Sequence, residues 1–202
     1  MVEQSRWIEM TKENPDHSAW YIERFRTMAA AGDDLSGEAR FVDAMVPRGS
    51  RILDAGCGPG RVGAILADLG HEVVGVDVDP ELIAAAELNH PGPTWLVGDL
   101  AELDLASQGI DERFDVILCV GNVMPFLAVT TRRTVLAAMR DHLAENGRVV
   151  IGFGAGRGYE FADFFVDAAG AGLVLDSKMA TWDMRPLTDQ SDFLVASFSR
   201  PT

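Results

Sequence analysis

The residues with the clearest capacity for chemistry are a cluster of glycines and two later acidic residues. Residues 54–60 read Asp-Ala-Gly-Cys-Gly-Pro-Gly and directly follow a short apolar run. Glycine allows positive φ and a close approach of the backbone to a ligand, because it has no side chain. Asp77 and Asp99 each end or follow a later apolar run, and a carboxylate accepts hydrogen bonds from hydroxyl or amine groups. The pattern predicts a ligand-binding loop with two acidic partners.

Loops of this kind serve two classes of cofactor, and the first is a dinucleotide. Gly58, Gly60 and Gly63 fit the spacing G-x-G-x-x-G, and Asp77 follows at about the 20-residue distance expected of a ribose ligand. Against this interpretation, Pro59 has no N–H to offer a phosphate. In addition, no tyrosine is followed four residues later by lysine, as in short-chain dehydrogenases. An NAD-dependent oxidoreductase stays open as the alternative of a different class.

The second class of cofactor is S-adenosylmethionine. The glycine segment, Val-Gly-Val-Asp at residues 74–77 and Gly98-Asp99 together resemble the class I S-adenosylmethionine-dependent methyltransferases. Two further matches are Phe-Asp-Val-Ile-Leu-Cys at residues 114–119 and Asn-Gly-Arg at residues 146–148. The resemblance implies S-adenosylmethionine as methyl donor and S-adenosylhomocysteine as product. A non-catalytic protein that only binds this cofactor, or a regulatory subunit, is a second alternative.

The resemblance also implies roles for individual residues. Asp77 would accept both ribose hydroxyls. Asp99 would accept the adenine amine, with the Leu100 N–H facing a ring nitrogen. Asp54 would hold the loop and approach the amino group of the methionine part. The other residues expected beside the cofactor are Gly56, Cys57, Gly58, Gly60, Val78 and Cys119.

Several of these residues have purely structural alternatives. Asp99 could cap a turn, since aspartate commonly does so. The helix that begins at Pro80 also needs an N-cap, and Asp79 suits that position better than Asp77 does. Cys57 is expected to fill space in the loop and not to act as a nucleophile, because the donor itself supplies the electrophile.

Two residues are candidates for a catalytic role, Asn122 and His17. Asn122 follows the fourth expected strand, so we expect it near the methyl group or the methionine end. Its alternative is a turn residue. Methyl transfer depends largely on positioning and exclusion of water, and it needs a base only when the acceptor must lose a proton. His17 is the histidine closest to the expected lid and could serve as that base.

The N-terminal segment, residues 1–48, is predicted to hold two helices and to act as a lid on the remaining domain, residues 49–202. The first helix is expected near residues 16–31. Tyr21 and Arg24 lie on one face of it. Arg24 could therefore meet the methionine carboxylate while Tyr21 closes over the cofactor. The alternative is a packing helix with a solvated arginine.

From residue 50 onward, apolar runs of strand length alternate with amphipathic segments of helical length, which predicts a parallel sheet covered on both faces. The last two strands have no helix between them and should form an antiparallel hairpin. With the resemblance, this gives an α/β, Rossmann-like sheet of seven strands, the last one antiparallel. The expected strands are residues 51–54, 73–77, 94–97, 114–120, 148–153, 173–182 and 192–198. The expected helices are residues 61–69, 131–143, 160–169 and one that begins at Pro80.

Composition limits the partners. The 202 residues carry 17 basic and 31 acidic side chains, a net charge of −14, which repels a nucleic-acid backbone. The densest basic stretch, residues 132–142, is expected as the solvated face of a helix.

Two cysteines and four scattered histidines indicate no metal site. Lacking a signal peptide or a membrane-length apolar run, the chain is expected to be cytoplasmic, a monomer or homodimer, with a small-molecule acceptor. Trp7 and Trp95 are expected to be structural.

Overall fold

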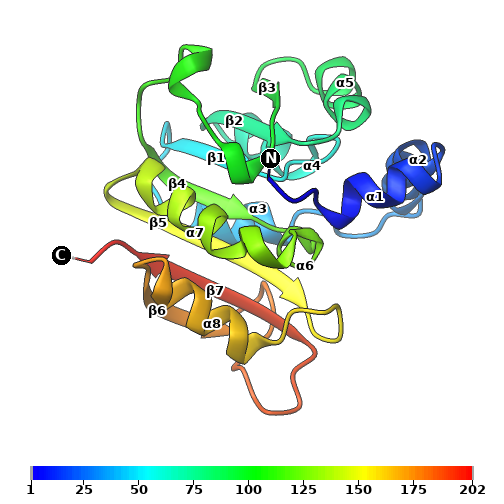
Figure 1. Ribbon diagram of the computed structural model, residues 1–202. Coiled ribbons are helices and arrows are strands. Elements are labelled where there is room, and N and C mark those ends of the chain that lie inside the picture. The colour runs from blue at the N-terminus through cyan, green and yellow to red at the C-terminus, as the bar shows by residue number, and fades with distance from the viewer. Residues whose placement is uncertain (1, 202) are drawn as a thin grey trace.

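Seven strands form one sheet in the order β3-β2-β1-β4-β5-β7-β6 in the computed structural model, which describes residues 2–201 (Figure 1). Neighbouring strands are parallel except β7, which runs antiparallel to both β5 and β6. The predicted fold class is confirmed. The strands are β1 (Arg51–Ala55), β2 (Glu72–Asp77), β3 (Thr94–Val97), β4 (Phe114–Cys119), β5 (Leu143–Gly154), β6 (Val174–Met179) and β7 (Phe193–Ser199).

Helices cover both faces of the sheet. They are α1 (Arg6–Glu13), α2 (His17–Ala30), α3 (Gly37–Asp43), α4 (Arg61–Asp68), α5 (Pro80–Asn89), α6 (Val123–Phe126), α7 (Arg132–His142) and α8 (Phe161–Gly170). Short 3₁₀ turns are η1 (Leu100–Glu102), η2 (Ala106–Gln108) and η3 (Val129–Thr131). In Figure 1, α7 and α8 lie in front of the sheet, while α3 and α4 lie behind it.

Side chains of the central strands alternate between two apolar cores. Ile52 packs with α3 and α4, whereas its neighbour Leu53 packs with α7 and α8. Both side chains are fully buried, because successive residues of a strand point to opposite faces. A strand buried on both faces therefore reads as an unbroken apolar run, which is why these strands could be predicted from the sequence.

Two glycines on strands leave room for tryptophan rings. A Cβ on Gly75 of β2 would lie 2.3 Å from the ring of Trp95, and a Cβ on Gly152 of β5 would lie 2.3 Å from the ring of Trp182. Trp95 is buried and its Nε1 donates to the carbonyl of His90 at 2.9 Å. The structural role predicted for Trp95 is confirmed.

The chain adds strands on opposite sides of β1. After β1 it forms β2 and β3 on one side, and then it crosses to the other side to form β4 and β5. In open α/β sheets, ligands bind at such a point, outside the carboxyl ends of the strands. The N-terminal helices α1 and α2 lie at this edge in Figure 1, and α2 packs against α5. This arrangement places the N-terminal segment beside the predicted ligand loop.

The N-terminal segment contains three helices where two were predicted. The missed helix is α1, which begins after the N-cap Ser5 and buries none of its own residues. Its half-buried residues Trp7, Ile8 and Met10 form an apolar face, but the helix has only 8 residues, fewer than the window of about 11–18 residues in which helical periodicity is recognised. Elsewhere, β5 begins at Leu143, five residues before the predicted start. No helix among residues 2–201 has the length and apolar character needed to span a bilayer.

Candidate functional site

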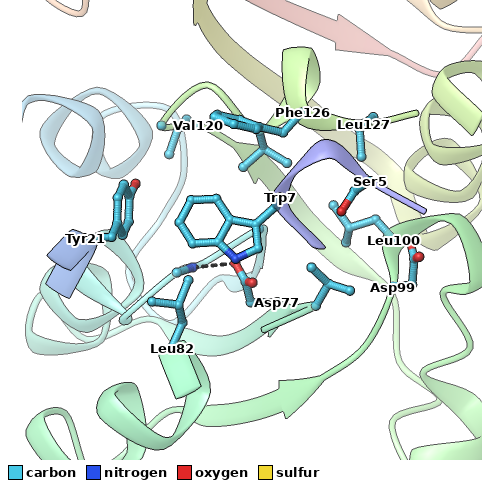
Figure 2. Close-up of a pocket in the computed structure, with 15 residues that line it drawn as sticks. Ser5, Trp7, Tyr21, Asp77, Leu82, Asp99, Leu100, Val120, Phe126 and Leu127 are labelled. Carbon is cyan, nitrogen blue, oxygen red and sulfur yellow. Dashed lines mark hydrogen bonds between the residues drawn. The ribbon is translucent and has the colours of Figure 1, made fainter. Parts of the chain in front are cut away.

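A cavity opens at the carboxyl edge of the sheet, between the first and fourth strands and beneath α1 (Figure 2). Four connections that follow strands β1 to β4 contribute to it, as expected at a topological switch point. Its lining from these connections comprises Gly56, Gly58, Asp77, Val78, Asp99, Leu100, Val120 and Gly121.

Two glycines of the loop have different surroundings: Gly56 is packed against the protein, whereas Gly58 faces the cavity. Gly56 has φ +84°, and a Cβ there would lie 2.4 Å from the side chain of Val123, so this residue must be glycine for the loop to pack. Gly58 has φ +55°, and a Cβ there would meet only the ring of Tyr21, at 3.6 Å. Gly58 therefore presents bare backbone to the cavity.

Asp77 fixes the loop from the end of β2. Its Oδ2 accepts a hydrogen bond from the Gly58 N–H at 2.8 Å, shown as a dashed line in Figure 2, and its Oδ1 accepts from the Asp79 N–H at 3.0 Å. Burial raises the pKa of Asp77 to about 6, although these two N–H groups act to lower it. Each carboxylate oxygen retains a second lone pair, so Asp77 can still accept two hydroxyl groups.

Asp79 is the N-cap of α5, as predicted. Its Oδ1 accepts from the Glu81 N–H at 2.8 Å. Its Oδ2 accepts from the indole Nε1 of Trp7 at 2.7 Å and from the hydroxyl of Ser18. One buried carboxylate thus caps α5 and also attaches both α1 and α2 to the edge of the cavity.

Asp99 and Leu100 line the cavity where β3 ends. The Oδ1 of Asp99 accepts from the Ala101 N–H at 2.9 Å, so the turn-cap alternative is present in the structure. A carboxylate has two oxygens, and capping with one leaves the other for a ligand. Leu100 is buried and, with Val78 and Leu82, supplies an apolar wall.

Trp7 contributes a large part of the cavity wall, which corrects the structural role expected for it. Its ring lies between Tyr21 and Phe126 in Figure 2, with edge-on contacts at centroid distances of 5.2 Å and 5.8 Å. Sequence reasoning also missed seven other lining residues: Ser5, Leu82, Val120, Gly121, Val123, Phe126 and Leu127. The apolar ones resemble ordinary core residues, so composition alone offered no signal.

Four residues predicted beside the cofactor place their side chains elsewhere. Asp54 is buried beneath the loop, where its Oδ2 accepts from the Gly63 N–H at 3.0 Å, and burial raises its pKa to about 7. Cys57 packs in an apolar cluster behind the loop, and Cys119 is fully buried in the core. A Cβ on Gly60 would lie 3.0 Å from the ring of Trp95. These residues shape the loop from outside the cavity.

A second, larger hollow adjoins the cavity, with a volume of about 600 Å³. Trp7, Tyr21, Gly121 and Phe126 line both spaces, so the two meet at these residues. Its remaining walls come from α2, α6 and the segment between β6 and β7.

Arg24 and His17 line this hollow and not the cavity. Tyr21 lines both spaces, whereas Arg24 lines the hollow alone. The ring of His17 stacks on that of Trp20 with centroids 5.5 Å apart. The contact between Arg24 and the methionine carboxylate stays a prediction.

Asn122 connects the exit of β4 to the end of β5. Its backbone is left-handed, with φ +68°, and its Oδ1 accepts from the Gly154 N–H at 2.8 Å. The turn alternative thus describes its backbone, while its side chain reaches a distant strand. Asn122 also lines the hollow, so the catalytic role predicted for it stays a prediction.

The basic stretch in α7 is largely bound within the protein. Arg132 is buried, stacks over the ring of Tyr159 with its guanidinium carbon 3.8 Å from the centroid, and donates to the carbonyl of Gly158 at 2.8 Å. The expected solvated face is therefore wrong for Arg132, because an arginine can bury its planar head against an aromatic ring. Residues 2–201 contain no cluster of three or more His, Cys, Asp or Glu side chains suited to a metal ion.

Comparison with known proteins agrees with this geometry. A family model described as a methyltransferase domain matches residues 52–147. The crystal structure of a TehB-like S-adenosylmethionine-dependent methyltransferase from Corynebacterium glutamicum is 48% identical in sequence, with a TM-score of 0.88, over 93% of this chain and 100% of that chain. The chain belongs to the S-adenosylmethionine-dependent methyltransferases.

Curated relatives of this methyltransferase are more distant. Putative methyltransferase YqeM of Bacillus subtilis is 30% identical over 47% of this chain and 41% of its own length. A ubiquinone biosynthesis O-methyltransferase of Cereibacter sphaeroides is 37% identical over 51% of this chain and 40% of its own length. The chain thus spans about two-fifths of the length of these relatives. Family membership makes S-adenosylmethionine the cofactor, as predicted.

Proposed function

We propose that this methyltransferase transfers a methyl group from S-adenosylmethionine to a small-molecule acceptor. The observation that carries the proposal is the junction of the cofactor cavity with the larger hollow at Trp7, Tyr21, Gly121 and Phe126. Transfer by in-line displacement needs donor and acceptor atoms held about 3–3.5 Å apart on opposite sides of the methyl group. Two adjoining spaces with a shared apolar border meet that need.

The residues around the cavity fit the chemistry of the cofactor. Asp77 retains acceptor capacity for the two ribose hydroxyls, and Gly58 leaves the loop backbone bare for the methionine part. Val78, Leu82 and Leu100 form an apolar wall suited to the adenine ring. Asp99 stands beside that wall as an acceptor for the exocyclic amine.

The cofactor supplies an electrophilic methyl group on a positively charged sulfur when it is bound. The chain's own task is to position the acceptor and exclude water. The rings of Trp7, Tyr21 and Phe126 do this at the junction, where an apolar border favours a reaction that disperses the sulfonium charge. His17 would accept a proton from acceptors that must lose one.

We infer that α1 acts as a lid that opens for cofactor exchange. The space beneath Trp7 measures about 90 Å³, whereas sites for small ligands usually measure about 300–1,000 Å³. The indole must therefore move outward for the cofactor to enter. Its bond to Asp79 and its two edge-on ring contacts are local and few, so such a movement leaves the sheet undisturbed.

Charge supports a small acceptor over nucleic acid. The chain carries a net charge of −14, and the basic residues of α7 are engaged with the protein itself. A phosphate backbone would have to approach a surface of like charge. The cytoplasmic location and the monomeric or homodimeric state stay predictions from sequence.

Purified protein with methyl-labelled donor and a mixed panel of small acceptors tests the proposal. We expect saturable binding of S-adenosylhomocysteine and label transfer to a subset of the panel. Binding without transfer to any panel member would instead favour the non-catalytic alternative. Preferential stabilisation by NAD, measured by thermal shift, would favour the dehydrogenase alternative, because the preferred ligand raises apparent stability more.

A further inference from the structure

The hollow beside the cofactor cavity is walled by aromatic rings. Phe25 and Trp20 come from α2, Phe126 from α6, and Trp182 and Phe193 from the segment that joins β6 to β7 and the start of β7. Trp20 is 55% exposed, an unusual position for a large indole. Flat rings on several sides favour a ligand that is itself planar and aromatic, since offset and edge-on ring contacts stabilise such pairs.

The hollow also holds two arginines whose side chains have no ion pair or hydrogen bond within the described part of the chain. Three of the arginine side chains, those of Arg24, Arg148 and Arg157, make no ion pair or hydrogen bond with any other described residue, whereas the others are all engaged. Two of these three, Arg24 and Arg157, line the one hollow. Arg24 lies over the ring of Phe25, with its guanidinium carbon 5.8 Å from the centroid, and this contact leaves its N–H groups available. In a chain with 31 acidic side chains, two guanidiniums at one site whose N–H groups have no acceptor favour an anionic ligand.

The other charges that line the hollow largely cancel. Arg61 pairs with Glu38 at 2.6 Å, and Asp34 pairs with Arg40 at 2.6 Å. The one remaining carboxylate on the lining is Asp192. Two free positive charges against one negative charge leave the hollow positive, in contrast to the chain as a whole.

Arg157 is placed near the residue that we expect to face the methyl group. A Cβ on Gly154 would lie 3.1 Å from Nε of Arg157 and 3.5 Å from Oδ1 of Asn122. Arg24 lines the hollow from α2, one helical turn from Tyr21 at the junction. An anionic group held between these arginines keeps its ring within the aromatic walls.

We propose that the hollow selects a small aromatic carboxylic acid as the methyl acceptor, with Arg24 and Arg157 as the residues that bind its carboxylate. This rests on the proposed function, since it names the acceptor class of the same site. The planar fork of a guanidinium matches the geometry of a carboxylate, and charge-assisted hydrogen bonds are about twice as strong as neutral ones.

Benzoate, benzamide and cyclohexanecarboxylate, titrated into protein saturated with S-adenosylhomocysteine and followed by ligand-observed NMR, test the two halves of this proposal. We expect benzoate to bind about tenfold more tightly than benzamide, which lacks the charge. We also expect it to bind more tightly than cyclohexanecarboxylate, which lacks the aromatic ring. Equal affinity for benzoate and benzamide overturns the proposal, as does tighter binding of benzamide.

Three single variants, each of which removes one positive charge, show which arginines cause the preference for benzoate. Arg24→Gln and Arg157→Gln should each remove most of the preference for benzoate over benzamide. Arg148→Gln, the third uncommitted arginine, lies on β5 away from the hollow and should retain that preference. Equal loss in all three variants would mean a general charge effect and overturns the assignment. Titration of S-adenosylhomocysteine shows whether each variant is folded and keeps its cofactor site.

The same samples separate this proposal from the proposed function. Discrimination for benzoate without methyl transfer to any compound of the panel would refute the proposed function and leave the anionic preference standing. Methyl transfer confined to amines or uncharged compounds would refute the preference and leave the methyltransferase function standing.

Discussion

Replacing Asp77 by asparagine tests the cofactor site at its most constrained residue. In the structure, the two carboxylate oxygens each hold one backbone N–H, that of Gly58 at 2.8 Å and that of Asp79 at 3.0 Å. Asparagine keeps one acceptor oxygen and turns an NH₂ group toward the other N–H. One of these backbone bonds is therefore lost, and one of the two expected ribose contacts is lost with it.

The magnitude follows from these two losses. A hydrogen bond to a charged group contributes about 1.5–3 kcal/mol, so losing one ribose contact should weaken S-adenosylhomocysteine binding by about 10-fold to 100-fold. Losing the backbone bond should lower the free energy of unfolding by about 1–3 kcal/mol. Isothermal calorimetry gives the first quantity and urea denaturation the second.

The pH dependence of S-adenosylhomocysteine affinity tests the same assignment. Hydroxyl donors favour the charged carboxylate, so binding should lower the pKa of Asp77 from its raised value of about 6. Affinity should therefore fall as pH drops below 6, by no more than about tenfold per pH unit. Asp77→Asn should remove this dependence, while Asp54→Asn, which alters the other buried carboxylate, should preserve it. Unchanged affinity in Asp77→Asn with an unchanged pH profile would refute the ribose assignment.

Three further predictions concern the loop, the lid and the second buried acid. Gly58→Ala should weaken S-adenosylhomocysteine binding at least tenfold, because the new Cβ enters open cavity space. The control is Gly109→Ala, which is also at positive φ and has nothing within 4 Å. It should show the same backbone strain of about 1–2 kcal/mol but bind S-adenosylhomocysteine normally. Trp7→Ala should speed both association and dissociation in stopped-flow fluorescence. Trp7→Phe, which loses the bond to Asp79 but keeps a smaller aromatic ring, should lie between it and the native protein. Burial raises the pKa of Asp54 to about 7, so the stability that the protonated carboxyl contributes is fully present below about pH 4 and is lost as pH rises through 7. Asp54→Asn should therefore reduce the fall in unfolding free energy between pH 5 and pH 8 by about 2–3 kcal/mol. An identical fall in both proteins would contradict this.

The fold could be predicted because its strongest determinants are local. Strands buried on both faces read as apolar runs, and the helices between them repeat apolar residues at helical spacing. Asp77 and Asp99 could be assigned to one site because parallel strands bring their carboxyl ends to the same edge. These features follow from sequence order and side-chain period, without knowledge of tertiary contacts.

The parts that could not be predicted depend on distant contacts. Trp7 belongs to the cavity only because Asp79, more than 70 residues later, accepts its indole N–H. Cys57 and Cys119 adjoin cavity residues in the sequence, but their side chains point into the core, and neighbouring residues of a strand or loop need not face the same way. Arg24 shares a helix face with Tyr21, yet only the tyrosine reaches the glycine loop.

The turn between β2 and α5 links cofactor binding to lid closure. Asp77 faces the cavity and also holds the Asp79 N–H, while Asp79 holds the indole of Trp7 and the hydroxyl of Ser18. A ligand that fixes Asp77 therefore fixes the group on which α1 and α2 rest, and closure of α1 in turn restricts Asp77. Linkage of this kind is reciprocal, so the factor by which removal of the Trp7 indole changes cofactor affinity should equal the factor by which the cofactor shifts the equilibrium between the open and closed lid.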